Sequence, residues 1–160
     1  MSETSLPAIR RDIQRVSPEL VRAASQFQAA ILADVGGRRG ALGGRIAPLS
    51  PRMKVAGPAF TVELRPGDNL MFHAALALAQ PGDVIVVEGK GDRSAALCGT
   101  IMTTQAQASG LAGFVVDAAV RDSDEIIESG FPVFSVGTNP NGPTKGLPGR
   151  VNWPVSLAGV

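Results

Sequence analysis

The hydrophobic positions of the chain follow two patterns that alternate along its length. Short apolar runs such as residues 83–89 (DVIVVEG) and 113–117 (GFVVD) are typical of strands buried on both faces of a sheet. Between these runs, apolar residues recur every three or four positions, which is the spacing of a helix that buries one face. Because strands and helices alternate, the sequence predicts the α/β fold class.

Apolar residues at helical spacing extend over residues 12–33, which predicts N-terminal helices in this segment. Proline is tolerated in the first turn of a helix but disrupts its interior, so Pro18 is expected to divide the segment into two helices. Ser17, directly before this proline, is a suitable N-cap.

The remaining elements are predicted in a single series without internal repeats, so residues 1–160 are predicted to form one domain. In chain order they are a strand over 55–64, a helix over 69–79 that Asn69 caps, a strand over 83–89, a loop over 89–94, a helix over 94–108, a strand over 113–117, a helix over 123–129 that ends at Gly130, a strand over 131–137 and a last strand from Val155.

Composition and charge exclude several classes of protein. The chain is 44% apolar and 18% charged, as in ordinary globular proteins. Its net charge is +1 with scattered Lys and Arg, so we expect no nucleic-acid partner. No apolar run reaches the length of a membrane span and no signal peptide is evident. The single cysteine, Cys98, excludes an internal disulfide, and together these features predict a soluble cytoplasmic protein.

Candidate chemistry gathers where the strand after Gly113 ends in Arg121 and Asp122. Ligands of α/β sheets bind beyond the carboxyl ends of the strands. A carboxylate there suits Mg²⁺ or Mn²⁺, and a guanidinium suits a substrate carboxylate or a developing enolate. Gly99 interrupts a predicted helix at a cost of about 1 kcal/mol, which indicates a helix break or a close backbone approach to a ligand. The pattern alone leaves another interpretation open, in which the pair is a structural ion pair and Asp122 caps the following helix.

The chain resembles the RraA-like family, which contains metal-dependent 4-hydroxy-4-methyl-2-oxoglutarate aldolases and regulators of ribonuclease E activity. The resemblance extends from about Ala30 to Val160 and implies a single-domain layered α/β sandwich with a mixed central sheet, of the swivelling β/β/α type. It rests on segments in the family's order: VAGPAFTV (55–62), GDN (67–69), PGDVIVVEG (81–89), GFVVDAAVRD (113–122), GFPVFSVG (130–137) and the tail motifs NGPTKG and GRVNWPV.

This resemblance implies a class II lyase that releases pyruvate from 4-hydroxy-4-methyl-2-oxoglutarate-type substrates and decarboxylates oxaloacetate by the same enolate chemistry. It implies that Arg121 contacts the pyruvyl group and acts catalytically, and that Asp122 binds the divalent metal, Mg²⁺ or Mn²⁺. The implied partners are a small 2-oxo acid and further copies of the chain in a homotrimer or hexamer. The backbone that would hold the substrate carboxylate comprises Gly99, Thr100, Ile101 and Met102.

Two departures from the family pattern favour the alternative function, a non-catalytic regulator that inhibits ribonuclease E. Thr100 occupies a position where the aldolases carry an acid that orders metal-bound water, so reduced metal affinity is expected unless Asp92 compensates. The family also continues beyond Val160, so the C-terminus is interpreted as truncated relative to it, which makes the assembly less certain.

Several other reactive side chains are expected to be structural. A Schiff-base mechanism needs a buried lysine, whereas Lys54, Lys90 and Lys145 lie in predicted loops. The expected structural residues are His73 and Cys98, packed among apolar neighbours. Asp117, inside a strand, is interpreted either as a partner of the residues around the metal or as a satisfied strand-end acid.

Overall fold

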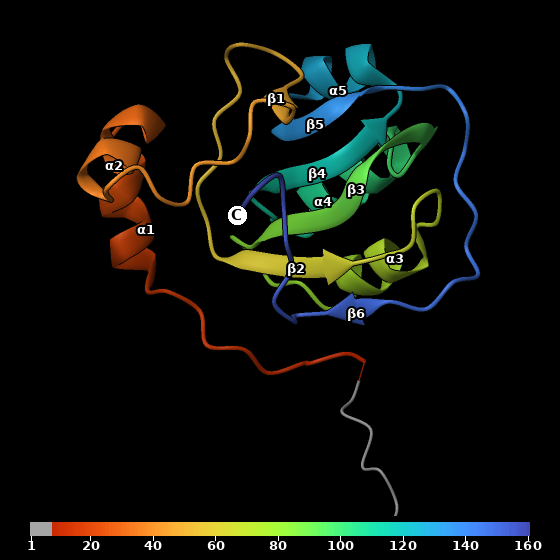
Figure 1. The fold of residues 1–160 in the computed structure, drawn as a ribbon, viewed down its shortest axis with the longest axis horizontal. Helices are drawn as coiled ribbons and strands as arrows, with labels where there is room; N and C mark the ends of the chain where they lie inside the picture. The colour runs from red at the N-terminus through yellow and green to blue at the C-terminus, as the bar shows by residue number, and fades with distance from the viewer. Residues whose placement is uncertain (1–7) are drawn as a thin grey trace, which may run out of the picture.

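Figure 1 shows the computed structural model of the chain, which describes residues 8–160. It is a six-stranded mixed sheet with five helices, which confirms the α/β class and the mixed sheet. The elements are α1 (Pro18–Ser25), α2 (Ala29–Val35), β1 (Ala47–Pro48), β2 (Ala59–Glu63), α3 (Leu70–Leu76), β3 (Val84–Ala96), α4 (Thr100–Ala108), β4 (Gly113–Val120), α5 (Ser123–Ser129), β5 (Val133–Thr138) and β6 (Arg150–Val151).

The sheet has the strand order β1-β5-β4-β3-β2-β6. The four central strands β2, β3, β4 and β5 are parallel, and the short edge strands β1 and β6 are antiparallel to their neighbours. The helices α3, α4 and α5 lie on one face of this sheet (Figure 1). Because the central strands run in one direction, their carboxyl ends share a single edge of the sheet.

One row of side chains across the sheet forms the centre of the core. Phe60, Ile85, Phe114 and Val133 are register partners on successive strands, and all four are fully buried. The ring of Phe72 from α3 packs edge-to-face on Phe114, with 4.9 Å between the ring centroids. Successive strand residues point to opposite faces, and the intervening Val86, Val115 and Phe134 are only partly buried, so the apolar runs fully bury the helix-covered face and only partly bury the other.

The N-terminal helices differ from the predicted segment 12–33. Helix α1 begins at Pro18, and Ser17 caps it by accepting a hydrogen bond from the Leu20 amide at 3.2 Å. Residues 12–16 are not helical, because this part of the chain is held extended by tertiary contacts: the Arg15 guanidinium donates to both carboxylate oxygens of buried Asp83, at 2.7 and 2.8 Å. The break between α1 and α2 lies at residues 26–28 instead of Pro18.

Helices α1 and α2 contain no buried residue and stand apart from the sheet (Figure 1). A hollow of about 920 Å³ separates their apolar sides from Val115 and Phe134 on the sheet. Among the residues that the structure describes, no helix combines the length and apolar character needed to cross a membrane.

The region before α4 was predicted incorrectly. Strand β3 continues through the predicted loop 89–94 and into the predicted helix 94–108. Lys90 and Gly91 adopt positive φ angles, and the strand then resumes its pairing with β4 after shifts in register. Gly99 is therefore the N-cap position of α4 and not an interior residue of a helix.

The C-terminal prediction was also wrong. The last strand is β6, which pairs antiparallel with the edge of β2, and no strand begins at Val155. In contrast, α5 and its end at Gly130, which has the left-handed conformation expected of a C-terminal glycine, match the prediction.

Candidate functional site

The candidate site lies where β3, β4 and β5 end. Arg121 and Asp122 follow β4 directly, and Gly99 lies in the connection from β3 to α4. Thr138 ends β5, and the chain then passes the same edge of the sheet. The structure therefore brings the predicted site residues together at the carboxyl ends of neighbouring parallel strands, where α/β proteins bind ligands.

The Asp122 side chain contacts the connection between β3 and α4 and not its own helix, α5. It occupies the N-cap position of α5 in the left-handed conformation (φ 56°), which costs a non-glycine residue about 1–2 kcal/mol, and its side chain caps nothing in α5. Its Oδ2 atom instead accepts a hydrogen bond from the Thr100 amide at 3.0 Å and lies 3.7 Å from Arg121 Nε. The N-cap interpretation is therefore wrong for this side chain, whereas the ion pair is present.

Only a glycine fits at position 99, because its neighbours leave no room for a Cβ atom. Its φ of −156° is accessible to any residue, but a Cβ atom at this position would overlap Asp122 Oδ2 and would lie 2.8 Å from Arg121 Cγ. The glycine in the sequence thus marks both a helix start and a close approach, in which the backbone meets the two charged side chains of the site.

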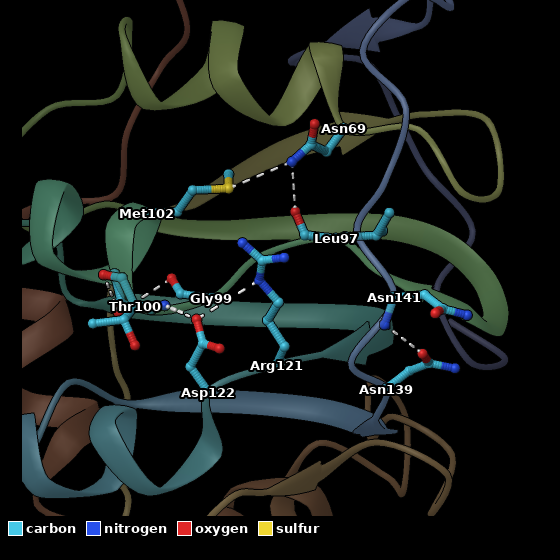
Figure 2. A network of polar contacts seen from close by, with 10 residues as sticks. Asn69, Leu97, Gly99, Thr100, Met102, Arg121, Asp122, Asn139 and Asn141 are labelled. Atoms are coloured by element: carbon cyan, nitrogen blue, oxygen red, sulfur yellow. Dashed lines mark hydrogen bonds and ion pairs between the residues drawn. The ribbon is translucent and has the colours of Figure 1, made fainter.

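The Arg121 side chain is half-exposed and extends from the end of β4 past Gly99 (Figure 2). Its backbone amide donates to the Cys98 carbonyl at 2.9 Å, which holds the start of the side chain beside the β3–α4 connection. A Cβ atom on Gly142 would lie 3.5 Å from Arg121 Nη1, so the chain after β5 borders the guanidinium.

The first turn of α4 contains the predicted carboxylate-binding backbone, from Gly99 to Met102. The amides of Thr100 and Met102 already donate within the protein, to Asp122 Oδ2 and to the Gly99 carbonyl (3.0 and 3.1 Å). Among residues 8–160, the amides of Gly99 and Ile101 have no such partner, so these two remain as donors for an anion at this helix start. Ile101 is strongly exposed, whereas Met102 is buried.

Asn69 does not act as the predicted cap of α3. Its buried side-chain amide donates to the Leu97 carbonyl at 2.9 Å and lies 3.6 Å from Met102 Sδ (Figure 2). The Leu70 amide at the start of α3 is instead bonded by Asp68 Oδ1, at 2.9 Å. Asn69 therefore connects α3 to the chain on both sides of Gly99.

A cleft of about 330 Å³ lies beside the charged pair, lined by Arg121, Asp122, Thr138, Asn139 and Pro140. It is open to solvent on the side of Asp122, whose side chain is 37% exposed. A small organic acid could therefore reach both the guanidinium and the carboxylate at once.

The cleft lining includes Asn139, a residue that we did not predict, and Asn139 bonds to nearby Asn141. Asn139 donates through Nδ2 to the Arg93 carbonyl at 2.7 Å, and its Oδ1 accepts from the Asn141 amide at 2.8 Å (Figure 2). The Asn141 carbonyl accepts in turn from the Ala96 amide at 2.8 Å. The segment NPNG in the sequence could have indicated this arrangement, because asparagine next to proline and glycine favours an ordered turn.

The donors at this site suit a hard divalent cation held by a single carboxylate. Asp122 uses Oδ2 for Thr100, and its Oδ1 makes no hydrogen bond within residues 8–160. Over the same residues no group of three His, Cys, Asp or Glu side chains could hold a metal, and Asp92, within β3, accepts a hydrogen bond from the Ser94 amide. Mg²⁺ commonly binds through one or two carboxylates and keeps several waters, so Asp122 fits Mg²⁺ or Mn²⁺ better than zinc.

We expect Gly99→Ala to lower the affinity for Mn²⁺ by about 10-fold or more, because the added methyl group must displace Asp122 or Arg121. Titration followed by the electron paramagnetic resonance of free Mn²⁺ measures this affinity directly. Gly44→Ala is the matched control, since a Cβ atom there meets no neighbouring atom. Equal Mn²⁺ affinities of the two variants would contradict the prediction.

Cys98 is buried, and burial followed by the charge of Asp122 raises the pKa of its thiol to about 12. The thiolate is the reactive form, so we expect native Cys98 to resist a thiol reagent such as 5,5′-dithiobis(2-nitrobenzoic acid) at pH 8 and to react after unfolding in guanidinium chloride. Because the pKa is raised, the thiol contributes to stability below about pH 8.5 and loses that contribution as the pH rises toward 12. Rapid labelling of the folded protein at pH 8 would show the prediction to be wrong.

The other reactive side chains lie in surroundings that fit a structural role. Asp117 is fully buried and accepts two hydrogen bonds from Arg45, each at 2.8 Å, so it is a satisfied strand residue. His73 is half-buried, and burial and then the charge of Lys145 lower its pKa. The lysines 54, 90 and 145 are exposed, as predicted, although residue 90 belongs to β3.

Comparison with known proteins identifies the class to which this fold and site belong. The family model for RraA-like proteins, described as Aldolase/RraA, matches residues 17–160. The chain therefore belongs to the RraA-like family.

Three relatives illustrate two of the names that similar proteins carry. The chain is 43% identical over 115 residues to a protein of Halalkalibacterium halodurans provisionally named 4-hydroxy-4-methyl-2-oxoglutarate aldolase; the match covers 72% of the chain but only 55% of that relative. Among solved structures, Streptomyces coelicolor RraAS2, titled an unusual member of the RNase ES inhibitor family, is 32% identical with a TM-score of 0.81 over 93% of this chain and 78% of that one. The RNA-processing inhibitor RraA from Thermus thermophilis is 28% identical with a TM-score of 0.76, covering 84% and 81%.

Proposed function

We propose that the chain is a divalent-metal-dependent carbon–carbon lyase that acts on pyruvyl substrates of the 4-hydroxy-4-methyl-2-oxoglutarate type and decarboxylates oxaloacetate. The observation that carries this proposal is the position of Asp122. Its carboxylate lines an open cleft, and its Oδ1 atom has no hydrogen-bond partner in the described part of the chain; Arg121 Nε lies 3.7 Å from Oδ2, next to a helix start. The names of the aldolase relatives support the same substrate class.

The residues of the chain have separate tasks in this reaction. The amides of Gly99 and Ile101 would hold the substrate carboxylate, and Arg121 would orient the 2-oxo group through its terminal nitrogens. Asp122 would hold the cation, Mg²⁺ or Mn²⁺, which supplies Lewis-acid polarisation of that carbonyl group. Cleavage of the C3–C4 bond would leave its electron pair on the pyruvyl C3 as an enolate, while the 4-hydroxyl group loses its proton to solvent and becomes the second carbonyl group; oxaloacetate would release CO2 instead. A solvent proton would then convert the enolate to pyruvate, and Arg121 would stabilise the negative charge on the enolate oxygen.

Pyruvate release tests the proposal directly. The purified protein is mixed with oxaloacetate or 4-hydroxy-4-methyl-2-oxoglutarate and Mg²⁺ or Mn²⁺, and pyruvate is detected through lactate dehydrogenase and NADH. We expect release above the rate of the cation alone, loss of that release with EDTA, and recovery when the cation is returned. Rates equal to those of the cation alone, with both substrates and both cations, would exclude the lyase.

A second candidate function is a non-catalytic inhibitor of a ribonuclease E-type endonuclease. Thr100 favours it, because this uncharged residue adds no second carboxylate beside Asp122 and its hydroxyl is buried without a partner in residues 8–160. The names of the Streptomyces and Thermus relatives describe this kind of activity. Inhibition of RNA cleavage by both the original chain and Asp122→Asn, without pyruvate release, would support this candidate.

A further inference from the structure

Asp68 is a fully buried acid in the connection from β2 to α3, outside the cleft lining. Its Oδ1 atom accepts a hydrogen bond from the Leu70 amide at 2.9 Å. Its Oδ2 atom accepts three, from the hydroxyl of Thr144 (2.8 Å) and the amides of Gly146 (2.7 Å) and Leu147 (3.1 Å). One carboxylate oxygen thus binds a segment that lies more than seventy positions away in the sequence.

The carboxylate of Asp68 is stabilised by dipoles and by no ion pair within residues 8–160. Burial by itself raises the pKa of Asp68, but the hydrogen bonds to it outweigh burial and lower the pKa overall. The group is therefore ionised at neutral pH. A buried charge that relies on three donors of one segment constrains that segment strongly, because each lost donor leaves the charge less solvated.

The segment that Asp68 binds borders the candidate site. A Cβ atom on Gly142 would lie 3.5 Å from Arg121 Nη1, so the chain there passes close to the guanidinium, and two residues later Thr144 begins the contacts with Asp68. Backbone bonds strengthen the same junction: the Asn69 amide donates to the Thr144 carbonyl at 2.9 Å, and the Thr144 amide donates to the Gly67 carbonyl at 2.8 Å. The Arg121 guanidinium thus lies beside the start of the segment 142–147, and Asp68 binds the rest of that segment.

The neighbouring residue extends the connection to the other side of the cleft. The Asn69 side chain bonds the Leu97 carbonyl and contacts Met102, which lie before and after Gly99 (Figure 2). Residues 68 and 69 therefore join both chain segments that border Arg121, one at Gly142 and one at Gly99.

We propose that Asp68 is a positioning residue of this site, whose buried carboxylate holds residues 142–147 so that the Arg121 guanidinium keeps its orientation between Gly99 and Gly142. The kinetic part of the proposal rests on the proposed lyase function, whereas the structural part does not. The comparison variant is Asp83→Asn. Asp83 is equally buried and accepts hydrogen bonds from Arg15 and Gln80, but it lies at the opposite, amino end of β3.

The test observes Arg121 without substrate or metal. In a ¹⁵N-labelled sample the Nε–Hε signal of Arg121 is assigned by its loss in Arg121→Lys. We expect Asp68→Asn to shift or broaden this signal and Asp83→Asn to leave it unchanged. An Arg121 signal at its original position and width in folded Asp68→Asn would overturn the proposal.

A second measurement separates this proposal from the proposed function. If pyruvate release is detected, Asp68→Asn is expected to reduce kcat/KM by about 10-fold and Asp83→Asn by less than about 2-fold. If no release is detected, the lyase function fails and the Arg121 signal alone decides the role of Asp68. Should Asp68→Asn not fold, Thr144→Val removes only one donor to Oδ2 and is judged by the same signal: a shift supports the proposal and an unchanged signal overturns it.

Discussion

Asp122→Asn is expected to remove metal-dependent pyruvate release, lowering kcat/KM on the order of 1000-fold. Of the described residues that line the cleft, Asp122 alone has a carboxylate, so the substitution removes the negative charge that would attract a divalent cation. Asparagine has nearly the same shape, and its carbonyl oxygen can still accept the hydrogen bond from the Thr100 amide. The expected loss of activity is therefore caused by the lost charge alone, because the β3–α4 connection should keep its structure.

Two measurements check this prediction. Pyruvate release is followed as a function of Mn²⁺ concentration, and Mn²⁺ binding is measured independently by electron paramagnetic resonance. The melting temperature should change by only a few degrees, because the ion pair with Arg121 is partly exposed and such pairs contribute about 0–1 kcal/mol.

Asp124→Asn is the matched control for Asp122→Asn. Asp124 is an exposed acid in the first turn of α5, two residues away, so its substitution removes the same charge from the same neighbourhood. We expect this control to bind Mn²⁺ and release pyruvate within about 2-fold of the original chain. If Asp122→Asn and Asp124→Asn behave alike, Asp122 is not the metal ligand.

The parts of this structure that could be predicted depend on local chemistry. Helix α5 begins directly after the Arg121–Asp122 pair and ends at Gly130, so its C-terminal bound followed from the capping glycine alone. The meeting of Gly99 with Arg121 and Asp122 could also be predicted, because a general rule places site residues at the carboxyl ends of parallel strands. The rule predicts at which edge of the sheet the residues lie but not which atoms touch. The hydrogen bond from the Thr100 amide to Asp122 is therefore known only from the structure.

The parts that could not be predicted depend on contacts between distant residues. The glycines around Lys90 predicted a loop, but pairing with β4 extends β3 through them to Ala96. The position of Asn69 next to a helical pattern predicted a cap, but the Leu97 carbonyl, 28 residues away, is its partner. In both cases a contact with a distant part of the chain outweighed the local preference of the residues.

Thr100→Asp is expected to increase the affinity for Mn²⁺ by about 10- to 100-fold, the opposite direction from Asp122→Asn. Position 100 begins α4, and its amide already contacts Asp122 Oδ2. A carboxylate there would add a second negative charge beside the first, and the resemblance to the family's aldolases implies an acid at this position. The threonine that it replaces has a buried hydroxyl with no hydrogen-bond partner in residues 8–160, so no hydrogen bond of the fold is lost.

The stability of Thr100→Asp should depend on metal more strongly than that of the original chain. Without a divalent cation the two carboxylates repel each other, so we expect a lower melting temperature. Mn²⁺ at 100 times its dissociation constant stabilises a folded protein by about 2.7 kcal/mol, so the melting temperature should rise when Mn²⁺ is added. Thr100→Asn is the control, because it has the shape of aspartate without its charge and should show neither effect.

The outcome for Thr100→Asp also discriminates between the two candidate functions. A gain in Mn²⁺ affinity together with faster pyruvate release would mean that the cleft already has lyase geometry and that the missing charge at position 100 limits the original chain. A gain in Mn²⁺ affinity without pyruvate release would mean that Arg121 and the helix start do not orient a 2-oxo acid, which favours the regulator. Unchanged Mn²⁺ affinity would show that the side chain at position 100 does not face the cation, and the proposed role of Asp122 would then depend on Asp122→Asn alone.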